Sequence, residues 1–167
     1  MATQTFTATV MNVALSANGG VATSSSNFNV SPYHFTAAGA NDGDRKGANW
    51  GSGSGFPGWL EIDFNGNKSI GEIDVFTVQD NYSSPSEPTE TMTFGNYGLT
   101  GYEVQYWNGS AWADVSGGSV GGNNKVWPEK FTPINVQLYD LPRGSRRRPV
   151  EPSGMRSRYG TCNSRSI

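Results

Sequence analysis

Apolar and polar residues alternate with a period of two over several short stretches of the chain. In the stretch 59–64, Leu60, Ile62 and Phe64 fall on one side, and the residues between them, two of them acidic, fall on the other. Successive side chains of a strand point to opposite faces, so this stretch predicts a strand with one wet face. In the stretch 70–78, apolar residues fall on both sides, which predicts a strand covered on both faces.

A second strand pair is predicted further along the chain. The stretch 102–106 alternates again, and the dipeptide Asn108-Gly109 separates it from 112–115. Asn-Gly is typical of a two-residue type I′ hairpin turn, because both central residues of that turn need positive φ. We therefore predict that 112–115 pairs back on 102–106.

Other stretches are predicted as loops or weaker strands. The stretch 80–98 has no sustained period, and connections of that length tend to be functional or ordered by their own contacts. We predict a flexible loop over 117–124, a strand weakened by a proline over 126–134, and an alternating strand over 135–139. No stretch predicts a helix. The chain is therefore predicted to be all-β, with about eight antiparallel strands.

Composition agrees with many short strands joined by turns. Charged residues make up 16% of the chain, aromatic residues reach 12%, and there are 22 glycines among the 167 residues. A chain of this length can form one domain with a sizeable core. The aromatic and β-branched residues provide enough apolar surface for the body to fold.

The net charge of -2 conceals two parts of opposite sign. Residues 1–140 hold five basic and thirteen acidic side chains, whereas residues 141–167 hold seven arginines and one acid. The body is therefore expected to repel nucleic acid, and only the second part could attract it.

The basic part, residues 141–167, is predicted to be a disordered tail that follows a domain spanning residues 1–140. It offers almost no apolar surface to offset about 1–2 kcal/mol of backbone entropy per ordered residue. The tail is interpreted either as a basic linker with its own purpose or as the product of a frameshift or recombination.

Several features leave the cellular compartment open. Cys162 is the lone cysteine, so the chain holds no internal disulfide. No signal peptide and no transmembrane segment is visible.

Asp42 and Asp44 stand two residues apart beside Gly43, and two such carboxylates repel each other unless a cation lies between them. An EF-hand is excluded, because Lys46 and Gly53 occupy positions that need oxygen ligands. The alternative to a cation is an Asx turn with no metal.

Enzyme classes find little support. His34 is the only histidine, so His-rich metal sites have no support, and no serine lies in a nucleophile-elbow motif. The glycine-rich run 51–55 lacks the lysine of a phosphate-binding loop. We therefore predict that the protein is not an enzyme.

Three segments together resemble a known family. They are the acidic run 41–44 that leads to Trp50, the strand 59–64, and the hairpin 101–112. They resemble the discoidin domain (coagulation-factor type C, or F5/8 type C), within the galactose-binding-like superfamily that includes many carbohydrate-binding modules. The resemblance runs from about residue 12 to about residue 134. It implies a jelly-roll β-sandwich and a lectin-like, non-catalytic binding function.

The resemblance also implies a structural Ca²⁺. Many carbohydrate-binding relatives hold this ion in an acidic loop just before a core tryptophan. By that analogy Asp42 and Asp44 supply side-chain oxygens, and the carbonyls of Ala40 and Gly47 complete the shell.

For the ligand, the resemblance implies a glycan, with galactose-type sugars favoured. A sugar presents hydroxyls that need oriented donors and one apolar face that suits a flat ring. His34, between two aromatic residues in a loop predicted over 24–39, is the expected donor, and the alternative is a histidine hydrogen-bonded within its loop. The candidate ligand residues are Tyr33, His34, Phe35, Arg45, Phe56, Asn81, Tyr82 and Tyr97.

Two other functions stay open. The first is a protein- or membrane-adhesion module that inserts Phe28, Tyr33, Phe35 and Phe56 into a partner, although a membrane is the less favoured partner. The second is an accessory structural protein without a small ligand. The sequence does not set the oligomeric state.

Overall fold

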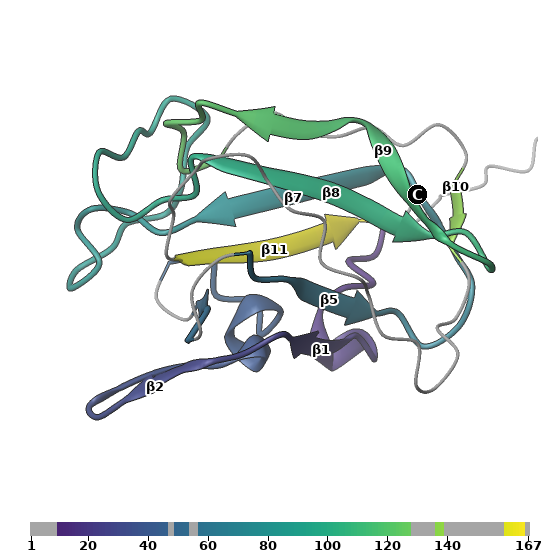
Figure 1. Cartoon of the computed structure of the whole chain (residues 1–167), viewed down its shortest axis with the longest axis horizontal. Coiled ribbons are helices and arrows are strands. Elements are labelled where there is room, and N and C mark those ends of the chain that lie inside the picture. Colours follow the sequence, from purple (N-terminus) through teal and green to yellow (C-terminus); the bar gives the residue numbers. More distant parts are fainter. Residues whose placement is uncertain (1–9, 47–48, 54–56, 128–135, 139–158, 166–167) are drawn as a thin grey trace, which may run out of the picture.

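The computed structural model describes residues 10–46, 49–53, 57–127, 136–138 and 159–165 (Figure 1). These ranges hold strands and two short 3-10 helices, which confirms the all-β prediction. Within them, no helix has the length and apolar character needed to cross a membrane. The elements are η1 (Ser16–Asn18), β1 (Val21–Ser24), β2 (Phe28–Val30), β3 (Tyr33–Phe35), η2 (Ala37–Ala40), β4 (Trp50–Gly51), β5 (Leu60–Asp63), β6 (Lys68–Ile70), β7 (Glu72–Thr77), β8 (Gly101–Trp107), β9 (Trp112–Gly121), β10 (Val136–Leu138) and β11 (Tyr159–Arg165).

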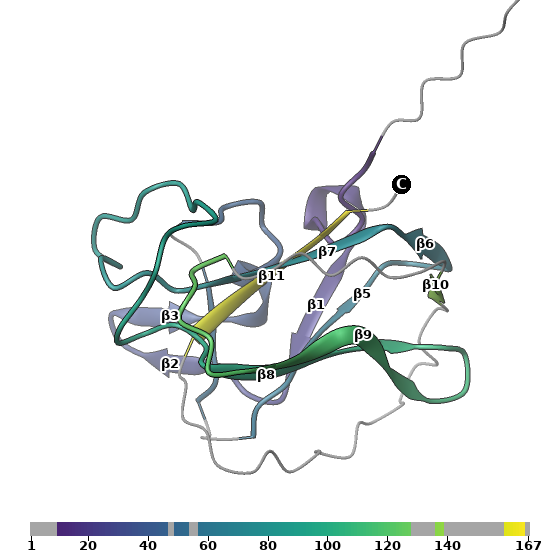
Figure 2. The same cartoon turned by 90° about the horizontal axis from the view of Figure 1, so that it is seen from above.

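The strands pair in small antiparallel groups that lie in two layers. β8 pairs with β9, and Figure 2 places this pair on one side of the molecule, across from β7, β11, β5 and β1. In the second layer β1 pairs with β5, β6 pairs with β10, and β11 lies between β4 and β7. The hairpin of β2 and β3 projects from one end of this layer (Figure 1). The arrangement is a β-sandwich.

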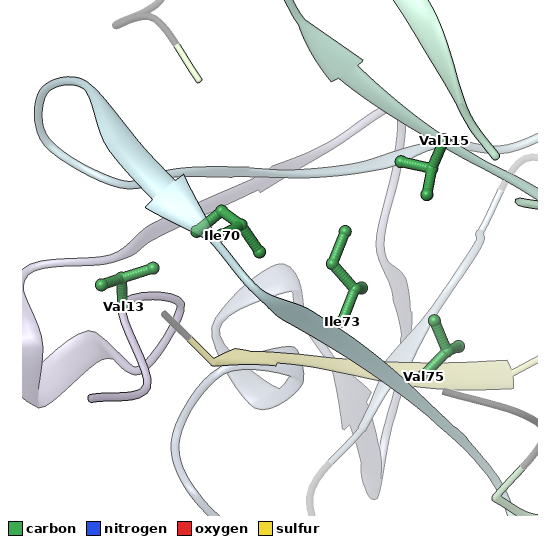
Figure 3. Close-up of a cluster of buried hydrophobic side chains, with 5 residues drawn as sticks. All are labelled: Val13, Ile70, Ile73, Val75 and Val115. Carbon is green, nitrogen blue, oxygen red and sulfur yellow. The ribbon is translucent and has the colours of Figure 1, made fainter. Parts of the chain in front are cut away.

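The main core lies between the two layers. Ile70, Ile73 and Val75 from β6 and β7 face Val115 from β9, and Val13 closes one end (Figure 3). Each of these five side chains is at most 8% exposed. Aromatic and valine side chains of β8 and β9, together with Phe64, pack around them. Burial of these apolar side chains holds the layers together, because each Å² of apolar surface removed from water contributes about 25 cal/mol to the stability of the fold.

Several predicted strands are confirmed. β5 lies within the predicted stretch 59–64, and β10 lies within 135–139. The return strand 70–78 is broken at Gly71 into β6 and β7. β7 is buried over Ile73–Thr77, which confirms that both of its faces are covered.

The predicted hairpin at Asn108-Gly109 is confirmed, but the prediction that its turn is of type I′ is wrong. Trp107 pairs directly with Trp112, so the connection has four residues instead of two. Asn108 does not have positive φ, and its Oδ1 accepts hydrogen bonds from the backbone N–H groups of Ser110 and Ala111. The asparagine side chain closes this turn, and an Asx turn is an alternative that the Asn-Gly dipeptide does not exclude.

Two predicted loops are strands in part. β9 continues through residues 117–121, because Val120 pairs with Tyr102 and both pack against the main core. The segment 24–39 holds the β2–β3 hairpin, whose strands of three residues are too short for alternation to reveal. In the predicted strand 126–134, Val126 and Trp127 lie outside any strand, and the remaining residues lie outside the described ranges.

Within the described ranges, the predicted tail contains one strand, at residues 159–165. These residues form β11, which pairs with β7 over six positions and with β4 over two. Backbone hydrogen bonds to two flanking strands can order a segment that has little apolar surface of its own. Residues 141–158 and 166–167 lie outside the described ranges, so the prediction for them is not tested.

Candidate functional site

The β2–β3 hairpin has one apolar face and one polar face. Residues directly opposite each other share a face, and Phe28 pairs with Phe35 while Val30 pairs with Tyr33. The ring centroids of Phe28 and Phe35 are 5.9 Å apart, as are those of Tyr33 and Phe35. Val30 is 57% exposed and Tyr33 is 48% exposed. This face, which we name the hairpin face, therefore presents apolar surface to solvent.

His34 lies on the opposite side of the same hairpin. It pairs in register with Asn29, and a hydrogen bond joins its Nδ1 to the Oδ1 of Asn29. Tyr33 and Phe35, its neighbours in the sequence, point to the hairpin face because side chains alternate along a strand. The structure therefore brings Tyr33 and Phe35 together but places His34 with an amide.

The acidic turn before β4 is closed by its own side chains. Oδ1 of Asp42 accepts the backbone N–H of Asp44 at 2.9 Å, and Oδ1 of Asp44 accepts that of Lys46 at 2.8 Å. Both are Asx turns, and both aspartates are exposed.

A calcium site would need 6–8 oxygens. Among the described residues, no group of three or more His, Cys, Asp or Glu side chains is placed to hold a metal. Ala40 lies at the end of η2, just before the turn, and Gly47 lies outside the described ranges. The described donors fit a pair of Asx turns better than a calcium cage, and calcium binding stays a prediction.

Asn41 fixes the base of this turn, a role that only its polar neighbours could have indicated. The side chain is 2% exposed, and its Nδ2 donates to the carbonyls of Ala14 at 2.8 Å and Gly20 at 3.1 Å. Its own carbonyl accepts the backbone N–H of Ser16. These bonds hold the start of the turn rigidly against the N-terminal part of the domain.

Arg45 extends from this turn toward the loop after β7. Its Nη2 forms an ion pair with Oε1 of Glu87, and its Cζ lies 5.3 Å from the centre of the Phe76 ring. Phe76 is buried and packs on Trp127 at a centroid distance of 5.1 Å. A guanidinium has five N–H donors, and a single carboxylate oxygen cannot accept hydrogen bonds from all of them. Arg45 is thus held in place by a ring and a carboxylate.

The loop over residues 80–98 is ordered by its own contacts, as predicted. Gln79 bonds twice to the backbone of Ser86, and the carboxylate of Asp80 accepts the backbone N–H groups of Gly95 at 2.8 Å and Asn96 at 2.9 Å. Within the loop, the side chains of Pro88 and Phe94 are buried. We refer to residues 80–98 as the β7–β8 loop.

The pKa of Asp80 lies below its ordinary value. Desolvation of the carboxylate acts to raise this pKa, but hydrogen bonds from the backbone N–H groups of Asn96, Gly95 and Tyr97 and from the Asn96 side chain outweigh it. Asp80 is therefore a carboxylate at neutral pH, and its charge strengthens these bonds.

The β7–β8 loop presents two tyrosines to solvent. Tyr82 and Tyr97 meet edge to face, with ring centroids 5.2 Å apart, and they are 52% and 37% exposed. Asn81 is also exposed, but its Nδ2 donates to the carbonyl of Ser84 and closes a turn. Glu87, the partner of Arg45, belongs to the same loop.

Five of the predicted ligand residues thus fall into two groups in the structure. Tyr82 and Tyr97 lie on the β7–β8 loop, to which Glu87 ties Arg45. Tyr33 and Phe35 lie on the hairpin face. Phe56 lies outside the described ranges.

Sequence reasoning missed Gln79, Asp80 and Glu87, because their partners lie up to 42 positions away. The one available signal was the presence of two polar residues where an apolar strand ends.

Comparison with known proteins identifies the class. Residues 39–137, more than half of the chain, match the family model of the F5/8 type C group described as the NedA-like, galactose-binding domain. The protein is thus a galactose-binding-like β-sandwich, a kind of domain that is typically a non-catalytic binding module. It belongs to the NedA-like galactose-binding domain family. No curated protein and no solved structure matches the chain.

Proposed function

We propose that this protein is a non-catalytic carbohydrate-binding module that holds a galactose-type glycan on the β7–β8 loop. The observation that carries the proposal is the exposed pair Tyr82 and Tyr97, on a loop that Glu87 also ties to Arg45. A tyrosine ring offers the flat apolar surface on which the apolar face of a sugar stacks. An arginine and a glutamate offer oriented donors and acceptors for hydroxyl groups.

The position of these residues in the family match supports the same site. Arg45, Tyr82, Glu87 and Tyr97 all lie within the matched residues 39–137. The β2–β3 hairpin, which carries His34, precedes the match. We therefore favour the β7–β8 loop over the hairpin as the glycan site.

The test is a binding titration with a simple galactoside, preceded by a glycan array to choose the sugar. We expect Tyr82→Ala and Tyr97→Ala each to weaken binding on the order of tenfold, which corresponds to about 1.4 kcal/mol and lies within the range of an aromatic stacking contact. Tyr33→Ala is the matched control, because Tyr33 has a similar exposure but lies on the hairpin face. Full affinity in both loop variants would show that the glycan binds elsewhere.

A specific observation favours adhesion as a second candidate. The hairpin face exposes Val30 and Tyr33 at the end of a projecting hairpin (Figure 1), and exposed apolar surface on such an element is typical of protein or membrane contact. A liposome pull-down separates the two functions: lipid binding that is lost in Tyr33→Ala and kept in Tyr82→Ala supports adhesion. If neither glycan nor lipid binds, an accessory structural role is favoured.

Isolated modules of this kind bind weakly. We therefore expect useful affinity to require several copies of the module on one scaffold, since linked sites raise the effective concentration of each other.

A further inference from the structure

Two consecutive polar residues, Gln79 and Asp80, lie just after β7, and each one holds a different part of the β7–β8 loop. β7 ends at Thr77 and is buried through its last residue, and Gln79 and Asp80 follow it after Val78. The strand is rigid because core residues cover it on both faces. Side chains that leave its end therefore provide fixed points for the longer segment that follows.

Gln79 holds the first half of the loop. Its Oε1 accepts the backbone N–H of Ser86 at 3.1 Å, and its Nε2 donates to the carbonyl of the same residue at 2.5 Å. The side-chain amide thus donates to and accepts from the backbone of one residue, as a paired strand residue does. It is only 6% exposed, so water competes little for these bonds. Ser86 precedes Glu87, and this contact therefore sets where Glu87 can meet Arg45.

Asp80 holds the second half of the loop. One oxygen accepts the N–H of Gly95 and the other accepts that of Asn96, 15 and 16 positions further along. Tyr97 follows immediately, and its ring meets Tyr82. Bonds to an ionised carboxylate are about twice as strong as those between neutral groups.

We propose that Gln79 and Asp80 are positioning residues for glycan recognition, which set the tyrosine pair and Glu87 before any ligand arrives. The inference rests on the proposed function of the β7–β8 loop. A free loop of this length would have to lose its conformational freedom on binding, and that loss subtracts from affinity. Two anchors at one strand end remove most of the freedom in the unliganded protein.

The experiment compares Asp80→Asn with Asp63→Asn in the full chain. Asp63 makes a related bond, from its Oδ1 to the backbone N–H of Asn65 at 2.8 Å, but within a turn between β5 and β6. Amide hydrogen exchange at Gly95 and Asn96 measures the anchor without any ligand. Titration with methyl β-galactoside measures recognition.

We expect Asp80→Asn to speed exchange at Gly95 and Asn96 and to weaken galactoside binding, each on the order of tenfold, because an amide offers one acceptor where the carboxylate offers two. Asp63→Asn should change neither quantity. Unchanged exchange in Asp80→Asn overturns the anchor, and faster exchange with unchanged affinity overturns the positioning role while the proposed function stands.

A wild-type chain that binds no galactoside overturns the proposed function and, with it, the positioning role. The exchange measurement then still shows whether the anchor exists, so the two failures are distinguished. Where Asp80→Asn lowers the soluble yield, Gln79→Glu tests the other anchor, with amide exchange measured at Ser86 and galactoside binding titrated in the same way. It keeps the acceptor for the Ser86 N–H and loses the donor to the Ser86 carbonyl.

Discussion

Arg45 forms an ion pair with Glu87, 42 positions further along the chain, and this contact joins the acidic turn before β4 to the β7–β8 loop. The ion pair thus links the two segments that contribute residues to the proposed glycan site. Beneath it, the Phe76 ring supports the guanidinium through a cation–π contact. The pair is therefore a useful probe of how the two segments depend on each other.

A double-mutant cycle with Arg45→Met and Glu87→Gln should give a coupling energy of about 0.2–1 kcal/mol. The two side chains are 33% and 52% exposed, and ion pairs open to solvent contribute little to the free energy of unfolding. Urea unfolding of the wild type, both single variants and the double variant provides the four values. A coupling energy above about 2 kcal/mol would contradict this and indicate a pair shielded from water.

The pH dependence of the β7–β8 loop should follow Asp80. Its pKa in the folded protein lies below the ordinary value of 3.8, so the loop is stabilised above pH 3.8 and loses that contribution as the pH falls through the lowered pKa. We expect the Gly95 and Asn96 amides to stay protected at neutral pH and to lose protection only at acidic pH below 3.8. Hydrogen exchange detected by NMR measures this, and protection that Asp80→Asn leaves intact at neutral pH would exclude Asp80 as the cause.

Gly20→Ala should destabilise the fold by about 3 kcal/mol or more, because overpacking against backbone has no easy relief. A Cβ at this position would lie 2.2 Å from the carbonyl oxygen of Ala14. Gly66→Ala is the control: its Cβ would meet nothing within 4 Å, and only its positive φ of 102° opposes the change, at about 1–2 kcal/mol. Equal losses in the urea midpoint would argue against the close approach at Gly20.

Removal of residues 141–167 should lower the free energy of unfolding by a few kcal/mol. The deletion takes away β11 and leaves β4 and β7 without the strand between them, and each lost backbone hydrogen bond costs about 0.5–1.5 kcal/mol. Chemical denaturation of the full and shortened chains compares them. Equal stability would support a domain that is complete at residue 140.

Calcium binding at Asp42 and Asp44 can be tested by thermal unfolding with Ca²⁺ and with a chelator. If the turn holds the ion as the resemblance implies, calcium at 100 times its Kd stabilises the wild type by about 2.7 kcal/mol, and Asp42→Asn removes that gain. The variant keeps an oxygen that accepts the Asp44 N–H, so its stability without calcium should change little. An unchanged wild-type melting temperature would leave the Asx turns as the whole function of these aspartates.

The sequence predicted those parts of the fold that depend on local alternation. Leu60 and Ile62 in β5, and the doubly covered β7, follow from the period of two and from apolar content alone. The β2–β3 hairpin did not follow, because three residues per strand show no periodicity. β11 did not follow either, since its order comes from pairing with β4 and β7 and not from its own residues.

The candidate site was predicted residue by residue but not as a geometry. Tyr82, Tyr97 and Arg45 are candidates because aromatic and guanidinium groups suit a sugar. The link between Arg45 and the loop that carries the two tyrosines depends on Glu87, whose distance along the chain hides the contact. His34 was expected beside aromatic rings, and the alternation along β3 instead turns it to Asn29.

The place of β11 in its sheet has a consequence for how the protein forms. Its residues meet β7 across sequence separations of 83 to 93 positions, which makes this pairing among the most distant in the domain. Contacts of that kind form slowly, because the chain must lose the entropy of closing a long loop before any hydrogen bond can offset that loss. During biosynthesis the edges of β4 and β7 stay unpaired until β11 has been synthesised, and in that interval the nascent chain is exposed to aggregation.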